Sequence, residues 1–513
     1  MTTAAISPPE TAGVDRPVVR PDRWIDRWEP EDQSFWDTGG SRIARRNLLL
    51  SIFAENLGFN IWVLWTIVVI NLQHVGIKLS LGDLFLLTAA PNLIGSLLRV
   101  PYTFAIPRFG GRAWTTFSVA LLLVPCTLVA VIVPSGWLAH QGSTTQFWVL
   151  LACAATAGVG GGNFSSSMAN ISFFYPERAK GFALGLNAAG GNLGVALCQL
   201  VAPLVIIIGV PAGLAKLPVH PVHLAYAGLV WMPFIAVAGV LAWTRMNSLT
   251  QARTDRGPWL RALRTPQTWL VSLLYIGTFG SFIGYSFALP LVIKNTFPSF
   301  LAGHPFIATY LAGLGFVGAL IGSLARPLGG RLADRIGGGV VTLVCFAGMA
   351  AGTAGAIDGV EQHSFALFFG AYVFVFLFSG AGNGSTYQRI PAIFSRLAAV
   401  EGGEPLEYKR RAAGAIGIAG AVGAFGGFMI QVAFRQASLP VVGAMTKAAK
   451  SITDPAQLQQ AVHRIAVAHA TWSISALWVF LGAYIVLGAV TWWQYVAGTA
   501  ASPVPRALAA EPG

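Results

Sequence analysis

The stretches LLRVPYTFAIPRFGG (residues 97–111) and LARPLGGRLADRIGG (residues 324–338) lie far apart in the chain and share one pattern. Each contains an arginine, Arg99 or Arg326, with a proline within the next two residues and two consecutive glycines beginning eleven residues later. A second pattern supports the same relationship, because three glycines at every second residue occur twice, as Gly158, Gly160 and Gly162 and again as Gly380, Gly382 and Gly384. The two patterns indicate that the chain is a duplication of one unit.

The composition is that of a membrane protein. Of the 513 residues, 55% are hydrophobic and only 10% are charged, and the mean hydropathy is +0.63. Soluble chains carry about 25% charged residues, so much of this surface faces something other than water. The four cysteines lie singly in apolar runs, without the spacing of a zinc site or a disulfide framework. We expect a polytopic membrane protein without a metal or another cofactor.

Windows long enough to cross a membrane divide the chain into two halves. A helix crossing a hydrocarbon core of ~30 Å needs about 20 mostly apolar residues. Twelve such windows occur, at residues 47–70, 84–106, 114–134, 146–170, 180–209, 222–244, 267–293, 306–330, 338–357, 364–390, 410–437 and 470–495. A basic connector separates the first six from the last six, which fits the duplication.

The loops alternate in charge along the chain. Most of the net charge of +13 lies in every second loop. The short loops on the opposite side contain only three basic residues, Lys78, Lys216 and Lys294. Basic loops remain in the cytoplasm, so we expect both termini there and attribute the charge to the membrane rather than to nucleic acid. The expected organisation is a cytoplasmic leader (1–46), a six-helix half (47–244), a cytoplasmic linker (245–266), a second half (267–495) and a cytoplasmic tail (496–513). Two interpretations of the leader stay open, a flexible segment and a cap on the cytoplasmic mouth.

The loop after the eighth window contains GRLADRIG, with Gly330, Asp334, Arg335 and Gly337. This tetrad resembles the cytoplasmic loop motif of the major facilitator superfamily, in which the acid and the base brace neighbouring helix ends. Together with the twelve windows and the duplication, it predicts an all-α integral membrane fold of two pseudosymmetric six-helix halves. In such transporters the substrate binds near the midplane, between the halves.

Charge inside the windows is rare and unbalanced. Of the 20 acidic residues only Glu55 lies clearly within a window, whereas Arg99 and Arg326 lie deep in theirs. Burying an arginine in a membrane costs at least ~2.5 to 3.5 kcal/mol, so such residues usually face a cavity or a partner. Two arginines at matching places without acidic partners indicate an anion site, because a guanidinium fork matches a planar oxyanion in bidentate fashion. The alternative is that each arginine snorkels or packs on carbonyls.

Two segments rich in glycine and polar residues surround these arginines in the sequence. In the first, residues 158–194, small residues such as Gly185 and Gly191 let helices approach closely. Its amides, Asn163, Asn187 and Asn192, need partners on apolar helices, and Asn187 is our candidate donor to an oxyanion. The second segment, residues 380–394, carries Asn383 and the polar run Ser385, Thr386, Tyr387 and Gln388, for which cavity lining and interhelical hydrogen bonding are both open.

These two segments resemble the signatures of the nitrate/nitrite porter family, the NarK type of the major facilitator superfamily, and the resemblance extends over roughly residues 47–495. It implies that Arg99 and Arg326 clamp the anion, with support from Asn187, Tyr275 and Phe279. The leader and the segment 438–469 exceed the family core. Val159 stands where relatives place a fourth-span aromatic, which predicts a looser wall there.

The resemblance and the two arginines predict a secondary transporter that exchanges nitrate and nitrite by alternating access in the cytoplasmic membrane. Glu55 leaves two alternatives open, a proton carrier for nitrate/proton symport and a buried acid bonded to a neighbour. A transporter for another small anion, sugar or drug is more distant. No nucleophile and base cluster or catalytic motif is present in the sequence, so we expect no enzymatic activity. We expect a monomer, with nitrate, nitrite and lipid as its partners.

Overall fold

A computed structural model describes residues 17–208, 222–253, 257–452 and 454–497. Over this part the chain is almost entirely helical, and twelve helical segments are long and apolar enough to cross a membrane. They are Gln33–Val75, Leu81–Thr103, Gly111–Val131, Ser143–Phe174, Glu177–Ile207, Tyr226–Arg245, Pro266–Thr296, Ala312–Ile336, Gly338–Glu361, Phe365–Glu401, Pro405–Ser451 and Ile474–Val496. The twelve expected spans are therefore confirmed.

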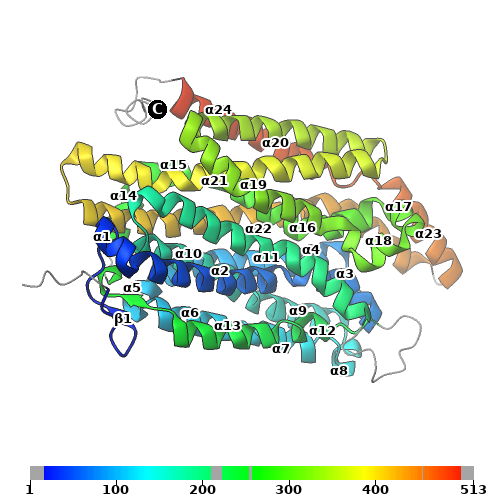
Figure 1. Cartoon of the computed structure of the whole chain (residues 1–513). Helices are drawn as coiled ribbons and strands as arrows, with labels where there is room; N and C mark the ends of the chain where they lie inside the picture. The colour runs from blue at the N-terminus through cyan, green and yellow to red at the C-terminus, as the bar shows by residue number, and fades with distance from the viewer. Residues whose placement is uncertain (1–16, 209–221, 254–256, 453, 498–513) are drawn as a thin grey trace, which may run out of the picture.

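The two halves lie side by side, with the helix axes roughly along the horizontal of Figure 1. The first half occupies the lower part of that view and the second half the upper part. Two short helices, α1 (Gln33–Phe35) and α14 (Gly257–Arg264), lie at the left, and we call this the linker end. The opposite end, here the far end, carries α8 (Gly136–Ala139), α17 (Pro298–Gly303) and α18 (Pro305–Tyr310).

The spans are built from helices that are often interrupted within one crossing. In the first half they are α2 (Ser41–Val63), α3 (Trp65–Asn71), α4 (Leu81–Thr103), α6 (Gly111–Leu121), α7 (Leu123–Val131), α9 (Ser143–Thr156), α10 (Gly158–Phe174), α11 (Glu177–Ile208) and α13 (Met232–Arg245). In the second half they are α15 (Pro266–Tyr275), the π-helix η4 (Ile276–Gly280), α16 (Ser281–Thr296), α19 (Gly315–Ile336), α20 (Gly338–Glu361), α21 (Phe365–Glu401), α22 (Pro405–Ser451) and α24 (Ile474–Thr491). The short helices α5 (Ala105–Phe109) and α12 (Tyr226–Leu229) complete the first half.

The segment 438–469, expected as a long connection, is mostly helix. The helix α22 continues to Ser451, and α23 (Pro455–Ala468) follows. A hydropathy window ends where the apolar residues end, whereas a helix continues as long as its residues favour it. The sequence GAMTKAAK (residues 443–450) is rich in Ala, Met and Lys, which are good helix formers.

The duplicated pattern corresponds to the same local structure in both halves. Gly110 follows α5 with φ +81°, and Gly337 follows α19 with φ +89°. A side chain is strained at such angles, so glycine is favoured at both positions. The following glycines, Gly111 and Gly338, begin the next spans.

The leader packs onto the linker end from residue 17 onward. Its strand β1 (Trp24–Ile25) pairs in parallel with β2 (Ser248–Leu249), the first part of the linker. Trp28 is buried, and its Nε1 donates to the carbonyl of Phe174 at 3.2 Å. Glu31 accepts the backbone N–H of Glu177 at 2.9 Å, at the start of α11. These contacts dock the described part of the leader on the linker end, and residues 1–16 lie outside the described residues.

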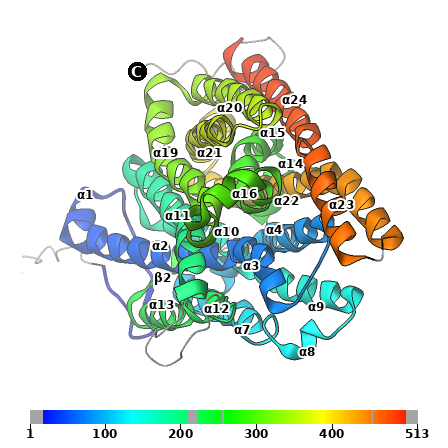
Figure 2. The same ribbon diagram turned by 90° about the vertical axis from the view of Figure 1, so that its right-hand side faces the viewer.

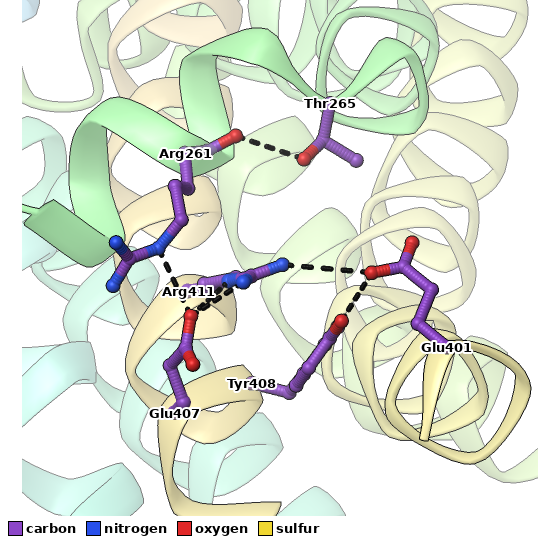
Figure 3. Close-up of polar contacts among 6 residues, drawn as sticks. All are labelled: Arg261, Thr265, Glu401, Glu407, Tyr408 and Arg411. Atoms are coloured by element: carbon purple, nitrogen blue, oxygen red, sulfur yellow. Dashed lines mark hydrogen bonds and ion pairs between the residues drawn. The ribbon is translucent and has the colours of Figure 1, made fainter. Parts of the chain in front are cut away.

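The second part of the linker is held by the other half. The helix α14 packs on α22, where Arg261 forms an ion pair with Glu407 at 2.9 Å (Figure 3). Glu407 also pairs with Arg411, which lies 3.7 Å from Glu401, and Glu401 accepts the hydroxyl of Tyr408. The linker is thus attached to both halves, at its start to the first and at its end to the second.

Candidate functional site

Arg99 lies in α4 and is completely buried. Its Nε donates to the carbonyl of Gly161 at 3.0 Å, and its Nη1 donates to the carbonyl of Gly420 at 2.7 Å. Gly161 belongs to α10 of the first half and Gly420 to α22 of the second half. Arg99 therefore joins the two halves through a backbone carbonyl, while its Nη2 has no hydrogen-bond partner among the described residues.

Arg326 occupies the matching place in α19 and is 2% exposed. Its Nη2 donates to the hydroxyl of Tyr275 at 3.2 Å. Its Nη1 has no partner within the described part of the chain. Each guanidinium thus keeps one buried nitrogen with an unused donor, and neither forms an ion pair with a described residue.

The ring of Phe164, in α10, lies against both guanidinium groups. The Cζ atom of Arg99 is 4.6 Å from the ring centre, and that of Arg326 is 5.5 Å from it. Phe279 stacks on Phe164 at 5.8 Å and on Tyr275 at 5.1 Å. These rings bring Arg99 and Arg326 to one aromatic cluster, as a cation over a ring face is favoured in a dry site.

Phe164 was not singled out from the sequence, and Tyr387 was named only as part of a polar run with two open interpretations. Phe164 supplies an aromatic wall from the fourth span, where Val159 predicted a looser one, and Val159 itself is half-buried against the core. A single bulky ring within GGGNFSSS (residues 160–167) is the signal that points to Phe164. The ring centre of Tyr387 lies 5.6 Å from the Cζ atom of Arg326 and 5.0 Å from the ring centre of Tyr275, so Tyr387 belongs to the same cluster.

Glu55 is the centre of a second buried group, formed by three helices of the first half. One oxygen, Oε2, accepts the hydroxyl of Ser167 at 2.5 Å and the amide Nδ2 of Asn187 at 2.9 Å. Asn187 Nδ2 also donates to Ser167 at 2.7 Å, and the hydroxyls of Ser167 and Ser51 lie 2.8 Å apart. The other oxygen, Oε1, has no hydrogen-bond partner among the described residues.

The structure places Asn187 beside Glu55, and its donor nitrogen is fully engaged there. An amide donates only through its nitrogen, so Asn187 reaches an anion only if Glu55 or Ser167 gives up this bond. Asn163 accepts from Ser118 at 3.0 Å, as a packing amide does. Asn383, by contrast, is buried with neither amide atom bonded to a described residue.

Most of the signature glycines allow close packing of helices, but the expectation was wrong for Gly185, where an added Cβ would meet nothing within 4 Å. A Cβ on Gly160 would lie 2.1 Å from the carbonyl of Gly58, and one on Gly384 would lie 2.0 Å from the carbonyl of Arg326. Similar crowding occurs at Gly158, Gly162, Gly191, Gly380 and Gly382. Because α21 rests directly on the backbone of Arg326, Gly384 sets the position of that arginine.

A cavity of about 400 Å³ reaches Arg326 from the linker end. It lies between α11 of one half and α19 and α21 of the other, and its lining includes Gly185, Gly330 and Asp334. Arg335 follows within the last turn of α19, and Gly337 ends that helix. The loop motif therefore lies beside the cavity that connects the linker end with Arg326.

Arg99 from the first half and Arg326 from the second are thus two buried cations with unused donors, and both contact one aromatic cluster. Within the described ranges no group of three His, Cys, Asp or Glu residues is arranged to hold a metal. This aromatic cluster lies at the interface of the two helical halves, the place where transporters built from two such halves bind their substrates.

The chain belongs to the Major Facilitator Superfamily, whose family model matches residues 48–429. It is 39% identical over 439 residues to the nitrate/nitrite transporter NarU of Escherichia coli, with 82% of this chain and 91% of the relative covered. It is 37% identical over 419 residues to a Thermus thermophilus protein named "Probable nitrate/nitrite antiporter NarK2", with 79% and 88% covered. The xylose transporter XylE from E. coli, in a partially occluded inward-open conformation, has the same fold at a TM-score of 0.61, with 14% identity and 89% and 98% of the two chains covered.

Proposed function

We propose that the protein is a secondary transporter that moves nitrate and nitrite across the cytoplasmic membrane by alternating access. The bound anion lies between Arg99 and Arg326, in contact with the rings of Tyr275 and Phe279. The observation that carries the proposal is the unused donor on each buried guanidinium, Nη2 of Arg99 and Nη1 of Arg326. The names of the relatives support nitrate and nitrite as the anions.

The same charges favour obligate exchange. Two guanidinium groups against one ring repel each other, and a monovalent anion between them relieves this repulsion. The transporter with a bound anion therefore changes between its two orientations more readily than the empty transporter. Exchange of nitrate for nitrite follows if Glu55 carries no proton. One chain contains both arginines, so the transporting unit is a monomer.

The linker end is the cytoplasmic end in this proposal. It carries the basic loops, among them Arg108, Arg112 and the linker arginines, and basic loops stay on the cytoplasmic side. Both termini are then cytoplasmic. Accessibility of a tag at either terminus in right-side-out vesicles tests this orientation, and labelling of the tag from outside contradicts it.

The arginine clamp is tested by counterflow of labelled nitrate in proteoliposomes. Lysine keeps the charge but replaces a planar fork with a point charge. Losing one charge-assisted hydrogen bond costs about 1.5 to 3 kcal/mol, so we expect Arg99→Lys and Arg326→Lys each to raise the nitrate KM roughly 10- to 100-fold. Arg264→Lys, at an exposed linker position, is the matched control. Wild-type counterflow in both clamp variants would refute the clamp.

Nitrate/proton symport is the second candidate, and the arrangement around Glu55 favours it. One carboxyl oxygen is free of hydrogen bonds, and the other holds the donor nitrogen of Asn187. Protonation of Glu55 weakens its hold on Asn187 and frees that amide for the anion, which couples a proton to nitrate.

The two candidates differ in one measurement. Under symport, nitrate addition to proteoliposomes moves protons in the wild type, and Glu55→Gln abolishes this movement while nitrate/nitrite exchange continues. Under exchange alone, neither protein moves protons with nitrate. Proton movement that persists unchanged in Glu55→Gln excludes Glu55 as the carrier.

A further inference from the structure

A cavity of about 620 Å³ lies between the halves at the far end. Figure 2 looks onto this end, where α3 of the first half and α16 of the second half lie near the centre, and these two helices are in contact. The cavity is lined by Ile70 of α3, by Pro290 and Lys294 of α16, and by His74 of the short helix η2 (Leu72–Val75) that follows α3. It is separate from the cavity that reaches Arg326 from the linker end.

Lys294 gives this cavity an unneutralised positive charge. Its Nζ donates to the carbonyl of Ile70 at 2.5 Å, which joins the second half to the first. A carbonyl uses one of the three ammonium donors and cancels none of the charge. The lining contains one other titratable side chain with a basic group, His74, and the lining residues, all within the described ranges, include no acid.

The central arginines are distant from Lys294. Fifteen residues of continuous helix separate Lys294 from Phe279, about 22 Å at 1.5 Å per residue. Between them, Gln199 of the first half donates to the carbonyl of Ser286 in α16 at 2.6 Å. The lining of the far-end cavity includes neither Arg99 nor Arg326, so an anion in this cavity is not yet at the central site.

We propose that Lys294 is an outer binding station for a small monovalent oxyanion, occupied before the central arginines; this inference rests on the proposed function. A cleft lined by one sign of charge concentrates counter-ions and raises their rate of entry. Lysine is a hydrated point charge without the fork of arginine, so it holds an oxyanion without demanding one geometry and releases it easily. Such a station collects the anion, while the arginine pair selects it.

The test measures nitrate uptake from each side of the membrane separately, in right-side-out and inverted vesicles. We expect Lys294→Gln to raise the KM for nitrate at the far end about 3- to 10-fold at low ionic strength, with unchanged turnover and unchanged KM from the linker end. The difference in far-end KM between Lys294→Gln and the wild type is expected to decrease as added salt shortens the Debye length. Glutamine keeps a donor for the carbonyl of Ile70, so the substitution changes mainly charge. Lys294→Arg is expected to behave like the wild type.

Lys78→Gln is the matched control, because Lys78 belongs to a loop at the same end, is exposed, and does not line the cavity. His74→Asp provides a second variant, which adds an opposing charge to the cavity and is expected to raise the far-end KM without altering Lys294. Absence of nitrate uptake by the wild type refutes the proposed function. Uptake by the wild type, with far-end KM values in Lys294→Gln and His74→Asp equal to that of Lys78→Gln, overturns only the outer station. An equal rise of KM from both ends in these variants also overturns it.

Discussion

Replacing Phe164 with leucine removes the ring that contacts both central guanidinium groups and leaves a side chain of similar apolar character. The Cζ atoms of Arg99 and Arg326 lie 4.6 and 5.5 Å from the ring centre. A desolvated cation–ring contact contributes about 2 kcal/mol, and the closer contact alone therefore predicts a loss of about this size. At 1.4 kcal/mol per factor of ten, the nitrate KM rises roughly 30-fold. The physical reason is that, in the proposed clamp, the ring holds the two guanidinium groups in the orientation that binds the anion.

The assay is the concentration dependence of nitrate counterflow in proteoliposomes. Phe173→Leu is the matched control, because Phe173 is a buried ring in the same helix and lines a cavity that includes neither Arg99 nor Arg326. Phe164→Tyr keeps a ring and is expected to stay within a few-fold of the wild type. The reasoning fails if Phe164→Leu and Phe173→Leu transport nitrate with the same KM while both proteins melt at similar temperatures.

Two further predictions concern the helices that support the site. Gly384→Ala is expected to destabilise the protein by about 1 to 3 kcal/mol, because the added Cβ overpacks against the carbonyl of Arg326. The control is Gly185→Ala, where the added Cβ has nothing within 4 Å. This variant is expected to melt at the temperature of the wild type in a thermal-shift assay. Trp28→Ala is expected to release the leader and make it sensitive to protease, because deleting a buried tryptophan costs about 3 to 5 kcal/mol. Trp137→Ala, at an exposed position, is the control, and equal cleavage of both variants contradicts the docking of the leader.

The fold followed from the sequence because membrane spans and duplication leave periodic signals. The twelve windows overlap the twelve spans, and Gly110 and Gly337 share one backbone conformation. The ends of α22 could not be predicted from hydropathy, because its last turns form through helix propensity and are not apolar. The packing of the leader also escaped prediction, because the pairing of Trp24 with Ser248 depends on contacts far apart in the sequence.

The two charged residues of the candidate site could be predicted from the sequence, but the residues that contact them could not. Arg99 and Arg326 are conspicuous since each is a costly residue in an apolar span. The hydrogen-bond partners of Arg99 are backbone carbonyls such as that of Gly420, and any residue type can provide a carbonyl. The association of Asn187 with Glu55 likewise depends on how three helices meet. The site roles of these residues remain predictions for the experiments above.

The attachment of the linker to both halves makes the protein a natural candidate for a split reporter. The pairing of Trp24 and Ile25 with β2 gives the first half its own tether, and the ion pair of Arg261 with Glu407 gives the second half another. A chain cut between Arg253 and Gly257 leaves both tethers in place on separate polypeptides. Fluorescent protein fragments fused at such a cut would then report the approach and separation of the halves during each transport cycle.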